Sequence, residues 1–368
     1  MTSPRMAIFS PSLQAGGAER VVLSLTEGFL QAGWNVHLLL GSAQGEFLAD
    51  VPAEARIFDF GSPRVAGAYP RLVRYLRRYR PTVLMSTQTH ANVVAALAFL
   101  LVRPPSRLIL AEHSAISYNL GPPIHPLKGA LIRFLAQRLL PRADAIVAVS
   151  QGVADDLVRT LGISRRDIRV IYNPIDLQRI QQGARERVEH PWLAKRGVSL
   201  VLSVGRLNNA KDYPTLLRAF AILRQRRDAR LLILGEGSER AMLEDLARAL
   251  GIAPWVEMPG YVANPYPYMA AADAFVLSSR WEGFPVVLVE ALMCGTPIVS
   301  TDCEFGPAEI LAGGDYGALV PVGDADALAQ AILRTLDDPP DRDRLRQRAR
   351  EFSFEAAMTQ YLNLAQEL

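Results

Sequence analysis

The stretch SSRWEGFPVVLVEALMCGTP, residues 278–297, places two carboxylates in an otherwise apolar run. Glu282 lies in a turn beside Gly283 and Pro285, and Glu290 follows eight positions later among apolar neighbours. A core helix has no structural need for a carboxylate there, and burying an unpaired one is costly. The pattern predicts that both side chains bind a ligand. Vicinal hydroxyl groups, such as those of a ribose, suit a carboxylate that accepts a hydrogen bond from each.

Short apolar strands alternate with helical stretches on both sides of this run. The helices are amphipathic, as in residues 18–33, where Val22, Leu25, Phe29 and Leu30 share one face. Such alternation is typical of parallel, doubly wound α/β sheets. The predicted strands are residues 6–10, 35–40, 82–86, 107–113, 145–150 and 168–173, then 199–205, 230–237, 255–261, 274–279, 297–302 and 317–322. We therefore expect two Rossmann-like domains that face each other across a cleft.

A polar segment, residues 174–197, interrupts the alternation and is interpreted as a hinge that leads into the second domain. The chain ends with an amphipathic helical segment, residues 343–368. We expect an N-terminal domain at 1–178, a C-terminal domain at 179–350, and a final helix at 351–368 that packs back on the N-terminal domain.

Composition restricts the class of protein. The chain has 368 residues, of which 50% are hydrophobic and 21% charged, as in globular proteins with two cores. Its two cysteines make neither a disulfide framework nor a metal site. The N-terminus lacks the features of a signal peptide, and the longest apolar run, residues 91–102, is too short to span a bilayer. We expect a cytoplasmic protein.

Charge is distributed unevenly along the chain. Residues 1–180 carry a net charge of +8 and the remainder carries −5, which gives +3 overall. A basic half favours an anionic partner, such as the surface of a membrane. Two helical segments, residues 69–81 and 125–144, contribute Arg71, Arg74, Arg77, Arg78 and Arg80 with Tyr75 and Tyr79, and Lys128, Arg133, Arg138 and Arg142. The alternative is that the arginines are merely solvated and the second helix packs in the core.

Two loops suit phosphate groups. Gly16 and Gly17 precede a helix, where backbone N–H groups and the helix dipole favour an anion, although a simple turn explains two glycines as well. Arg206 and Lys211 share one strand-to-helix loop and could clamp a diphosphate, or simply be solvated. Neither a G-x-G-x-x-G dinucleotide motif nor a P-loop occurs.

The motifs GRLNNAKD, GEGSER and NPYPYMAAADAFVLSSRWEGFPVVLVEALMCGTPIVSTDCEFGPAEIL, with AGGAER, AEHS, VAVSQG and VIYNPID before them, resemble the retaining glycosyltransferases of family 4. These enzymes have the GT-B fold. The resemblance implies that Glu282 contacts the donor sugar and Glu290 the ribose. It also implies that Arg206 and Lys211 hold the diphosphate and that His113 lies near the sugar. Further donor contacts are implied at Gly16, Gly17, Gly235, Tyr261, Val262, Gly283, Phe284 and Pro285.

The reaction that the resemblance implies is transfer of a hexose or N-acetylhexosamine from a nucleotide-sugar, most simply a UDP-sugar. The acceptor would be a hydroxyl of a glycan or lipid-linked molecule in surface polysaccharide synthesis. The N-terminal domain would bind the acceptor and the C-terminal domain the donor. We expect no cofactor, no Asp-x-Asp metal site and no nucleic-acid partner, and we favour a front-face route because no protein nucleophile is evident. A nucleotide-sugar epimerase and a non-catalytic subunit of a glycan-assembly complex are the alternatives.

Overall fold

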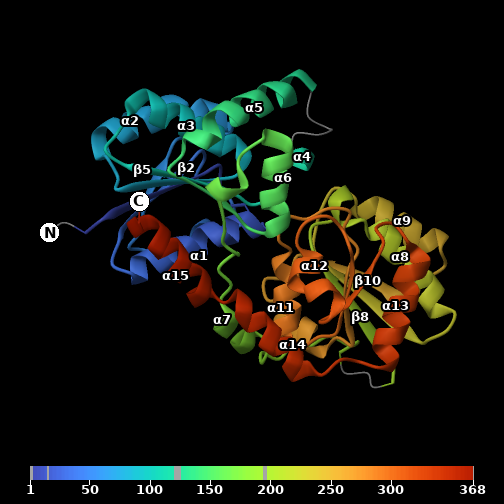
Figure 1. Cartoon of the computed structure of the whole chain (residues 1–368). Coiled ribbons are helices and arrows are strands. Elements are labelled where there is room, and N and C mark those ends of the chain that lie inside the picture. The colour runs from blue at the N-terminus through green and yellow to red at the C-terminus, as the bar shows by residue number, and fades with distance from the viewer. Residues whose placement is uncertain (1–2, 15, 120–125, 194–196, 368) are drawn as a thin grey trace. The chain divides into compact units, whose positions relative to one another are not determined.

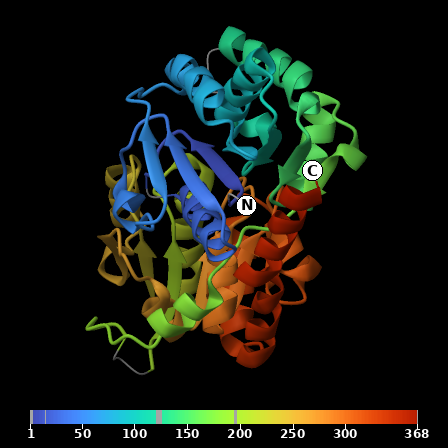
Figure 2. The ribbon, with the colours of Figure 1, turned by 90° about the vertical axis from the view of Figure 1, so that its left-hand side faces the viewer.

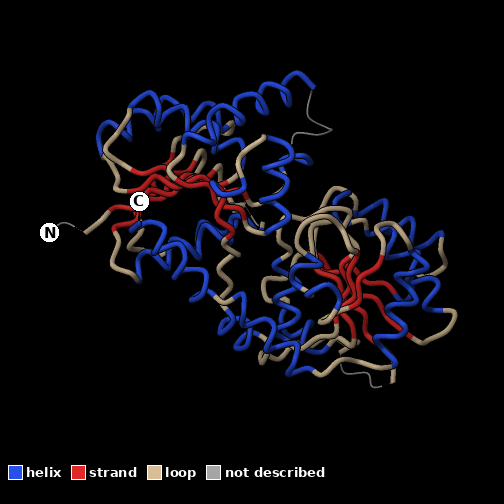
Figure 3. The backbone as a smooth tube through the Cα atoms, in the orientation of Figure 1, coloured by secondary structure: helices blue, strands red, loops and turns tan. Residues whose placement is uncertain are grey.

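The computed structural model describes residues 3–14, 16–119, 126–193 and 197–367. The chain forms two compact units, each with its own sheet (Figure 3). Unit 1 comprises residues 1–175 and 354–368, and unit 2 comprises residues 176–353. These limits lie within three residues of the boundaries expected at 178 and 350.

Unit 1 contains a seven-stranded parallel sheet with the order β3-β2-β1-β4-β5-β6-β7. The strands are β1 (Arg5–Ser10), β2 (Asn35–Leu40), β3 (Arg56–Asp59), β4 (Val83–Thr87), β5 (Arg107–Glu112), β6 (Ala145–Ala148) and β7 (Ile168–Val170). The sequence predicts all of these except β3. That strand lies at the edge of the sheet with most of its residues exposed, so it carries no apolar run that a hydrophobic pattern could reveal.

Helices cover both faces of this sheet (Figure 1). One face carries α2 (Tyr69–Tyr79), α3 (Thr89–Val102) and α5 (Pro126–Leu139), and the other carries α1 (Gly17–Gln31) and α15 (Phe354–Glu367). Two further helices are α4 (Ile116–Asn119) and α6 (Gln151–Leu161). Helices on both sides bury the sheet, which explains why its central strands are apolar throughout.

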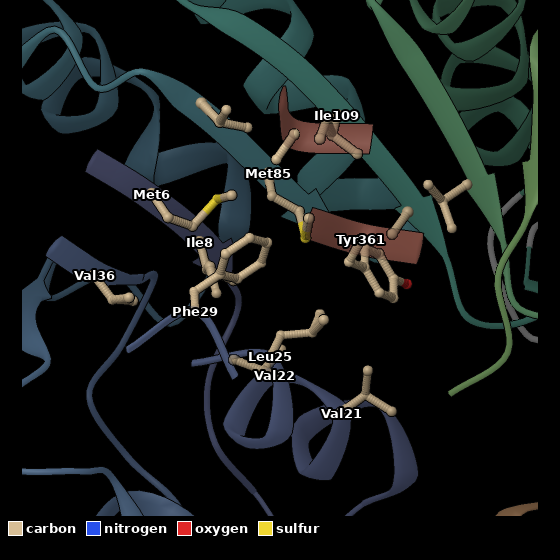
Figure 4. Close-up of a cluster of buried hydrophobic side chains, with 14 of the residues drawn as sticks. Met6, Ile8, Val21, Val22, Leu25, Phe29, Val36, Met85, Ile109 and Tyr361 are labelled. Carbon is tan, nitrogen blue, oxygen red and sulfur yellow. The ribbon is translucent and has the colours of Figure 1, made fainter. Parts of the chain in front are cut away.

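The C-terminal helix α15 belongs to the core of unit 1 (Figure 4). Tyr361 is fully buried and lies in one cluster with Ile8 of β1 and Phe29 of α1. At Gly28 a Cβ atom would lie 2.5 Å from the Met358 sulfur, so the absent side chain lets α15 pack closely on α1. Residues 354–368 therefore belong to the same compact unit as residues 1–175.

The terminal segment is not one helix, as residues 343–368 suggest, but two. Helix α14 (Arg342–Ala349) belongs to unit 2, and α15 belongs to unit 1. Between them Phe352 packs against Phe284, and Ser353 is extended with φ −67° and ψ 156°. The break lets the chain leave one core and enter the other.

The tyrosines of α2 are part of unit 1 rather than of its basic surface. Tyr75 is 3% exposed, and its hydroxyl lies 2.8 Å from Nδ1 of His37 in β2. Tyr79 stacks on Tyr75 with ring centroids 5.0 Å apart, and Phe58 of β3 contacts both rings. The two rings, which are interleaved with arginines in the sequence, therefore pack together with Phe58 and His37.

Unit 2 contains a six-stranded parallel sheet with the order β10-β9-β8-β11-β12-β13. The strands are β8 (Ser199–Val204), β9 (Ala229–Leu234), β10 (Val256–Gly260), β11 (Ala274–Leu277), β12 (Ile298–Thr301) and β13 (Ala318–Val320), all of which the sequence predicts. Figure 2 shows the same ribbon from a second side. Together the two sheets confirm the doubly wound α/β class.

In unit 2 one helix precedes β8, single helices alternate with the strands from β8 to β13, and two helices follow β13. The helices are α7 (Leu177–Gly183), α8 (Tyr213–Arg224), α9 (Arg240–Ala249), α10 (Tyr266–Ala271), α11 (Val286–Cys294), α12 (Pro307–Ile310), α13 (Ala325–Asp337) and α14. Short 3₁₀ helices lie in unit 1 at Glu46–Asp50, Val65–Ala68, Leu140–Arg142 and Arg165–Asp167. Those of unit 2 lie at Asn209–Lys211, Ala253–Trp255, Ala312–Gly314 and Arg350–Phe352. The segment interpreted as a hinge thus contains α7, which Asp176 caps by accepting the Arg179 N–H at 2.8 Å.

Candidate functional site

The sheet of unit 2 has a switch point between β8 and β11. From β8 the chain continues to β9 and β10 on one side, and from β11 it continues to β12 and β13 on the other. Ligands of such sheets bind at this point, outside the carboxyl ends of the two strands. The loop after β8 carries Arg206 and Lys211, and the loop after β11 carries Glu282. Three of the predicted site residues therefore lie where the topology favours a ligand.

Lys211 and Glu282 form an ion pair at the switch point. Lys211 Nζ donates to Glu282 Oε1 at 2.5 Å, and the two side chains are 19% and 12% exposed. Ser279 Oγ donates to the same carboxylate oxygen, also at 2.5 Å. The serine bond has the length of a charge-assisted O–H···O⁻ hydrogen bond, and the lysine bond joins two opposite charges. The carboxylate is thus held in place by two donors on one oxygen.

Further hydrogen bonds join the two loops. Ser278 Oγ donates to the Lys211 carbonyl at 2.7 Å, and the Arg280 N–H donates to the Ala210 carbonyl at 2.8 Å. Arg280 also pairs with Asp212 at 3.2 Å. Sequence patterns alone did not single out Ser278, Ser279, Asp212 or Arg280. The local sequence gives no signal for them, because Ser279 stands three residues before Glu282.

Arg206 and Lys211 differ in their surroundings. Arg206 is exposed, whereas Lys211 is partly buried against Glu282. The predicted pair of cations therefore shares one loop, and Lys211 meets the predicted acidic residue there. Gly235, in the loop after β9, has φ +148°, and a Cβ there would lie 2.0 Å from the Gly205 carbonyl oxygen. Only glycine permits this approach of neighbouring loops.

Glu290 lies in the middle of α11 and is partly buried. The Tyr266 hydroxyl, from α10, donates to its Oε1 at 3.3 Å. Glu282 lies in the loop before this helix, because α11 begins only at Val286. The residues between, Gly283, Phe284 and Pro285, are buried in the loop that leads into the helix.

Two buried cysteines lie near the two glutamates. Burial raises the pKa of the Cys303 thiol to about 12, and the negative charge of Glu282 adds to the shift. Burial also raises the pKa of Cys294 to about 12, with a further contribution from Glu290. Both thiols therefore stay protonated at neutral pH, consistent with reduced core cysteines.

The loop after β10 carries the residues expected at a nucleobase. Tyr261 is 56% exposed and Val262 is partly buried. An exposed aromatic ring at the carboxyl end of a strand offers a flat apolar surface on which a base can stack. The exposure of the ring is therefore compatible with the expected contact.

Two Asp-x-Asp spacings occur in the chain, at residues 324–326 and 341–343. Asp324 caps α13 by accepting the Ala327 N–H at 2.9 Å, and Asp341 caps α14 by accepting the Arg344 N–H at 2.8 Å. Helix capping accounts for the first aspartate of each spacing. Within the described ranges, no three His, Cys, Asp or Glu side chains are grouped as a metal site would require.

Unit 1 places the other predicted residues at the carboxyl edge of its sheet. Gly16 precedes α1 with extended backbone, φ −169°, and no side chain caps the helix there. A Cβ at Gly17 would meet no atom within 4 Å, so close packing does not explain this glycine. The start of α1 therefore offers backbone N–H groups without a steric barrier.

His113 follows β5 directly. Burial lowers its pKa to about 4, and an interaction with the Asn173 side chain opposes part of the shift. Neither ring nitrogen is exposed to solvent, and neither makes a well-aligned hydrogen bond to any residue that the structure describes. The ring is therefore neutral at pH 7.

Glu112, the last residue of β5, is a buried carboxylate that sequence patterns did not single out. It is 0% exposed and accepts hydrogen bonds from Thr89 Oγ1 and Asn92 Nδ2, each at 2.8 Å. Burial raises its pKa to about 7, and the nearby charge of Asp156 contributes to the shift. Glu112 directly precedes His113 in the motif AEHS, and this position was the one sequence signal that could have indicated it.

Helix α5 exposes three large apolar side chains: Leu127 is 76% exposed, Leu131 57% and Phe134 51%. Its opposite side is buried at Gly129, Ala136 and Leu139. The helix is therefore apolar on two sides. Across the part of the chain that the structure describes, no helix has the length and hydropathy needed to cross a bilayer.

Comparisons with known proteins agree with these features. The model of the family described as Glycosyltransferase Family 4 matches residues 15–179, and that of Glycosyl transferases group 1 matches residues 185–352. A Campylobacter jejuni protein named N-acetylgalactosamine-N,N'-diacetylbacillosaminyl-diphospho-undecaprenol 4-alpha-N-acetylgalactosaminyltransferase is 33% identical over 345 residues, 91% of this chain and 90% of that protein. A lipopolysaccharide core biosynthesis glycosyltransferase of Rhizobium meliloti, LpsE, is 37% identical over 60% of this chain and 64% of its own length.

Among solved structures, the Anabaena protein HepE in complex with UDP has a TM-score of 0.81 and covers 99% of this chain and 100% of its own, at 20% identity. This similarity shows that the two chains share the GT-B fold. The Campylobacter and Rhizobium relatives are both named as transferases, so the comparisons do not support the alternative of an epimerase. The two matching family models and the relative matched over nine tenths of its length show that the chain belongs to glycosyltransferase family 4.

Proposed function

We propose that this enzyme transfers a hexose or N-acetylhexosamine from a UDP-sugar to a hydroxyl of a glycan or lipid-linked acceptor in surface polysaccharide synthesis. The observation that carries the proposal is the Lys211–Glu282 pair at the switch point of unit 2, with Glu290 eight residues further on. The names of the relatives agree, since one acts on a diphospho-undecaprenol-linked sugar and HepE was solved with UDP.

The donor would be bound by groups that differ in charge. Arg206 and Lys211 meet the diphosphate, because both are cations on the loop after β8. Glu290 accepts hydrogen bonds from the ribose, and the exposed Tyr261 ring with Val262 lies against the base. Glu282 accepts hydrogen bonds from the sugar hydroxyls, and backbone groups at Gly283, Phe284 and Pro285 contact the same sugar.

In unit 1, His113 and the glycines at the start of α1 serve the same reaction. The neutral imidazole of His113 offers a hydrogen bond to a sugar hydroxyl, and its low pKa keeps it uncharged. The N–H groups at Gly16 and Gly17 favour the negative charge of the diphosphate.

The proposed chemistry retains the configuration at the anomeric carbon and needs no metal ion or cofactor. The bond from the anomeric carbon to the diphosphate oxygen breaks, and the acceptor oxygen bonds to the same face. The acceptor proton moves to the departing diphosphate. Negative charge grows on the leaving group, so positive groups fixed near it before the reaction supply the main stabilisation. Arg206 and Lys211, on one loop of unit 2, provide them.

A transfer assay tests the proposal. The purified protein is incubated with UDP-sugars and lipid-diphosphate-linked acceptors, and the anomeric configuration of the product is read by NMR. Glu282→Gln should reduce the rate of transfer by about a hundredfold or more, because it removes the negatively charged carboxylate that accepts hydrogen bonds from the sugar hydroxyls. Epimerised donor would indicate the epimerase. Binding of UDP without turnover of any sugar would indicate a non-catalytic subunit.

We also propose that the enzyme works at an anionic membrane surface, through α5. The exposed residues Leu127, Leu131 and Phe134 follow the spacing i, i+4, i+7, which forms one stripe on a helix. Lys128 and Arg133 lie on either side of the stripe, and the helix contains no acidic residue.

An apolar stripe between cations fits a bilayer with anionic headgroups better than it fits a protein surface. The apolar side chains enter the interface, and each cation near it adds about 1 kcal/mol. Arg138, whose guanidinium lies 5.2 Å from the Phe134 ring centroid, continues the stripe with positive charge. Helix α2 lacks such a stripe because its apolar side chains are buried.

Flotation with liposomes distinguishes the two basic helices. Lys128→Glu with Arg133→Glu on α5 should abolish binding to vesicles rich in anionic lipid, and Leu131→Ser with Phe134→Ser should do so without any change in charge. The matched control, Arg74→Glu with Arg77→Glu on α2, changes the charge equally and should leave most binding intact. Concentration-dependent self-association, lost on Leu131→Ser, would assign the stripe to a second copy and refute membrane docking.

A further inference from the structure

Glu282 is held by two donors that sequence motifs do not connect with it. Ser279 Oγ and Lys211 Nζ both donate to Oε1 at 2.5 Å. Among the described residues, the hydrogen bonds to this carboxylate all end on Oε1, so Oε2 remains the oxygen that a ligand can meet. Two donors on one oxygen fix the plane of the carboxylate as well as its position.

Ser279 itself is buried and hydrogen-bonded to the sheet. It is 0% exposed and follows the end of β11 by two residues. Thr301, the last residue of β12, donates from Oγ1 to the Ser279 carbonyl at 2.6 Å. The serine is therefore tied to the neighbouring strand, and its hydroxyl direction follows from the sheet rather than from a flexible loop.

Lys211 is tied to the same edge. Ser278 Oγ donates to the Lys211 carbonyl, and the Arg280 N–H bonds to Ala210 beside it. The backbone on both sides of the Glu282 carboxylate is thus joined directly. A glutamate on an unsupported loop would sample several rotamers, and each sampled rotamer reduces the population that can bind a sugar.

We infer that Ser279 is a positioning residue that, with Lys211, orients the Glu282 carboxylate so that Oε2 faces the donor sugar. This inference rests on the proposed function, because it assigns Glu282 to the sugar. It gives Ser279 no contact with substrate. It also gives Lys211 a second role, since its ammonium group has three donors and can contact a diphosphate while it holds Glu282.

The inference predicts a specific kinetic pattern for Ser279→Ala. The carboxylate becomes free to rotate, so kcat should fall about tenfold while the affinity for UDP stays within about twofold. In the Glu282→Gln background, Ser279→Ala should cause no further loss, because the group that it positions is already changed. Ser279→Thr, which keeps the hydroxyl, should recover much of the rate.

Because Ser279 is fully buried, a control for the loss of a buried hydroxyl is needed. Ser300 of β12 is also 0% exposed, and its Oγ donates to the Thr301 carbonyl at 2.8 Å. Ser300→Ala should leave kcat within about twofold of the wild-type value. Ser279→Cys, nearly equal in volume but a weak donor, should behave as Ser279→Ala if that variant melts early.

Equilibrium binding separates this inference from the proposed function. Isothermal titration calorimetry compares the affinity for UDP with that for UDP-N-acetylglucosamine, in wild type, Ser279→Ala and Glu282→Gln. In both variants, the ratio of the affinity for UDP-N-acetylglucosamine to that for UDP should fall by the same factor. If wild type transfers no sugar, the proposed function fails while this comparison still tests the orientation. The inference is overturned if Ser279→Ala leaves kcat unchanged. It is also overturned if Ser279→Ala lowers kcat by the same factor in the Glu282→Gln background as in the wild-type background.

Discussion

Replacing Glu112 by glutamine should change how the stability of unit 1 depends on pH. The carboxyl group is 0% exposed, and its pKa is raised from 4.5 to about 7, mainly by burial. Glutamine has nearly the same shape and can keep hydrogen bonds to Thr89 and Asn92, but it does not titrate. The substitution therefore isolates the cost of ionising this carboxyl group inside the fold.

The sign follows from proton binding in the two states. Below pH 4.5 both the folded and the unfolded chain hold the proton, and Glu112 has no effect. Between pH 4.5 and 7 the unfolded chain loses the proton and the folded chain keeps it, so wild-type stability falls as pH rises. Above pH 7 both are ionised and the loss is complete. At 1.36 kcal/mol per pH unit, the total is about 3 kcal/mol.

The stability of Glu112→Gln relative to wild type should therefore rise by about 2.5 kcal/mol between pH 5 and pH 8. His113 and His37 act in the opposite direction, since burial lowers the pKa of each to about 4 and their contribution grows as pH rises. Both histidines are present in wild type and in Glu112→Gln, so their contributions to the free energy of unfolding cancel, to first order, in the difference between the two proteins.

Hydrogen exchange of the β5 amides, corrected for the intrinsic dependence on pH, measures the free energy of opening of unit 1. The matched control is Glu19→Gln, since Glu19 is a partly exposed carboxylate of the same unit that accepts a hydrogen bond from Gln88. Its difference from wild type should lack a rise of this size, because Glu19 is not buried. A difference for Glu112→Gln that also lacks this rise would refute the claim that this carboxyl group is held largely protonated below pH 7 by burial.

Three further substitutions test the donor site and its support. Glu290→Ala should weaken UDP binding about tenfold through loss of the ribose hydrogen bonds, as calorimetry would show, and unchanged affinity would remove that assignment. Arg206→Ala and Lys211→Ala should each reduce turnover at least tenfold while the melting curve persists and EDTA has little effect; strict dependence on added Mg²⁺ or Mn²⁺ would contradict their role. Gly235→Ala should lower the melting temperature by several degrees, because its Cβ would lie 2.0 Å from the Gly205 carbonyl oxygen at φ +148°, and an unchanged melting temperature would show that the loops adjust.

The fold was largely predictable because buried parallel strands are continuous apolar runs. Strands such as β4 and β6, which are buried along their whole length, stand out against the polar turns around them. The edge strand β3 has no such contrast, since Ile57 is 39% exposed and its neighbours are polar. Pairing with β2 alone makes it a strand, and local sequence does not reveal pairing partners.

The split of the C-terminal segment into α14 and α15 was not predictable for a related reason. Residues 343–368 keep a helical apolar period, and no proline or glycine interrupts it. The break at Ser353 results from two cores that each bury one part of the segment: Leu345 and Phe352 in unit 2, and Tyr361 in unit 1. Tertiary packing overrides a continuous helical pattern in this case.

At the site, motifs identified Lys211 and Glu282 but not what holds them. Ser279 is a small residue before a loop, and nothing in its neighbours shows that its hydroxyl meets a carboxylate three residues later. Glu112 was equally hidden, because a charged residue at the end of a strand is usually exposed, whereas α3 covers this one. The burial of Tyr75 was not predicted either, because arginines surround it in the sequence while its partner, His37, lies in a distant strand.

The most direct test of the account is a crystal structure of the protein with UDP bound. The account predicts the ribose hydroxyls at about 3 Å from the Glu290 carboxylate and the diphosphate at the loop of Arg206 and Lys211. Glu282 Oε1 should still accept from Ser279, with Oε2 open towards the site of the sugar. UDP bound away from the switch point of β8 and β11, or with Glu290 out of reach of the ribose, would contradict it.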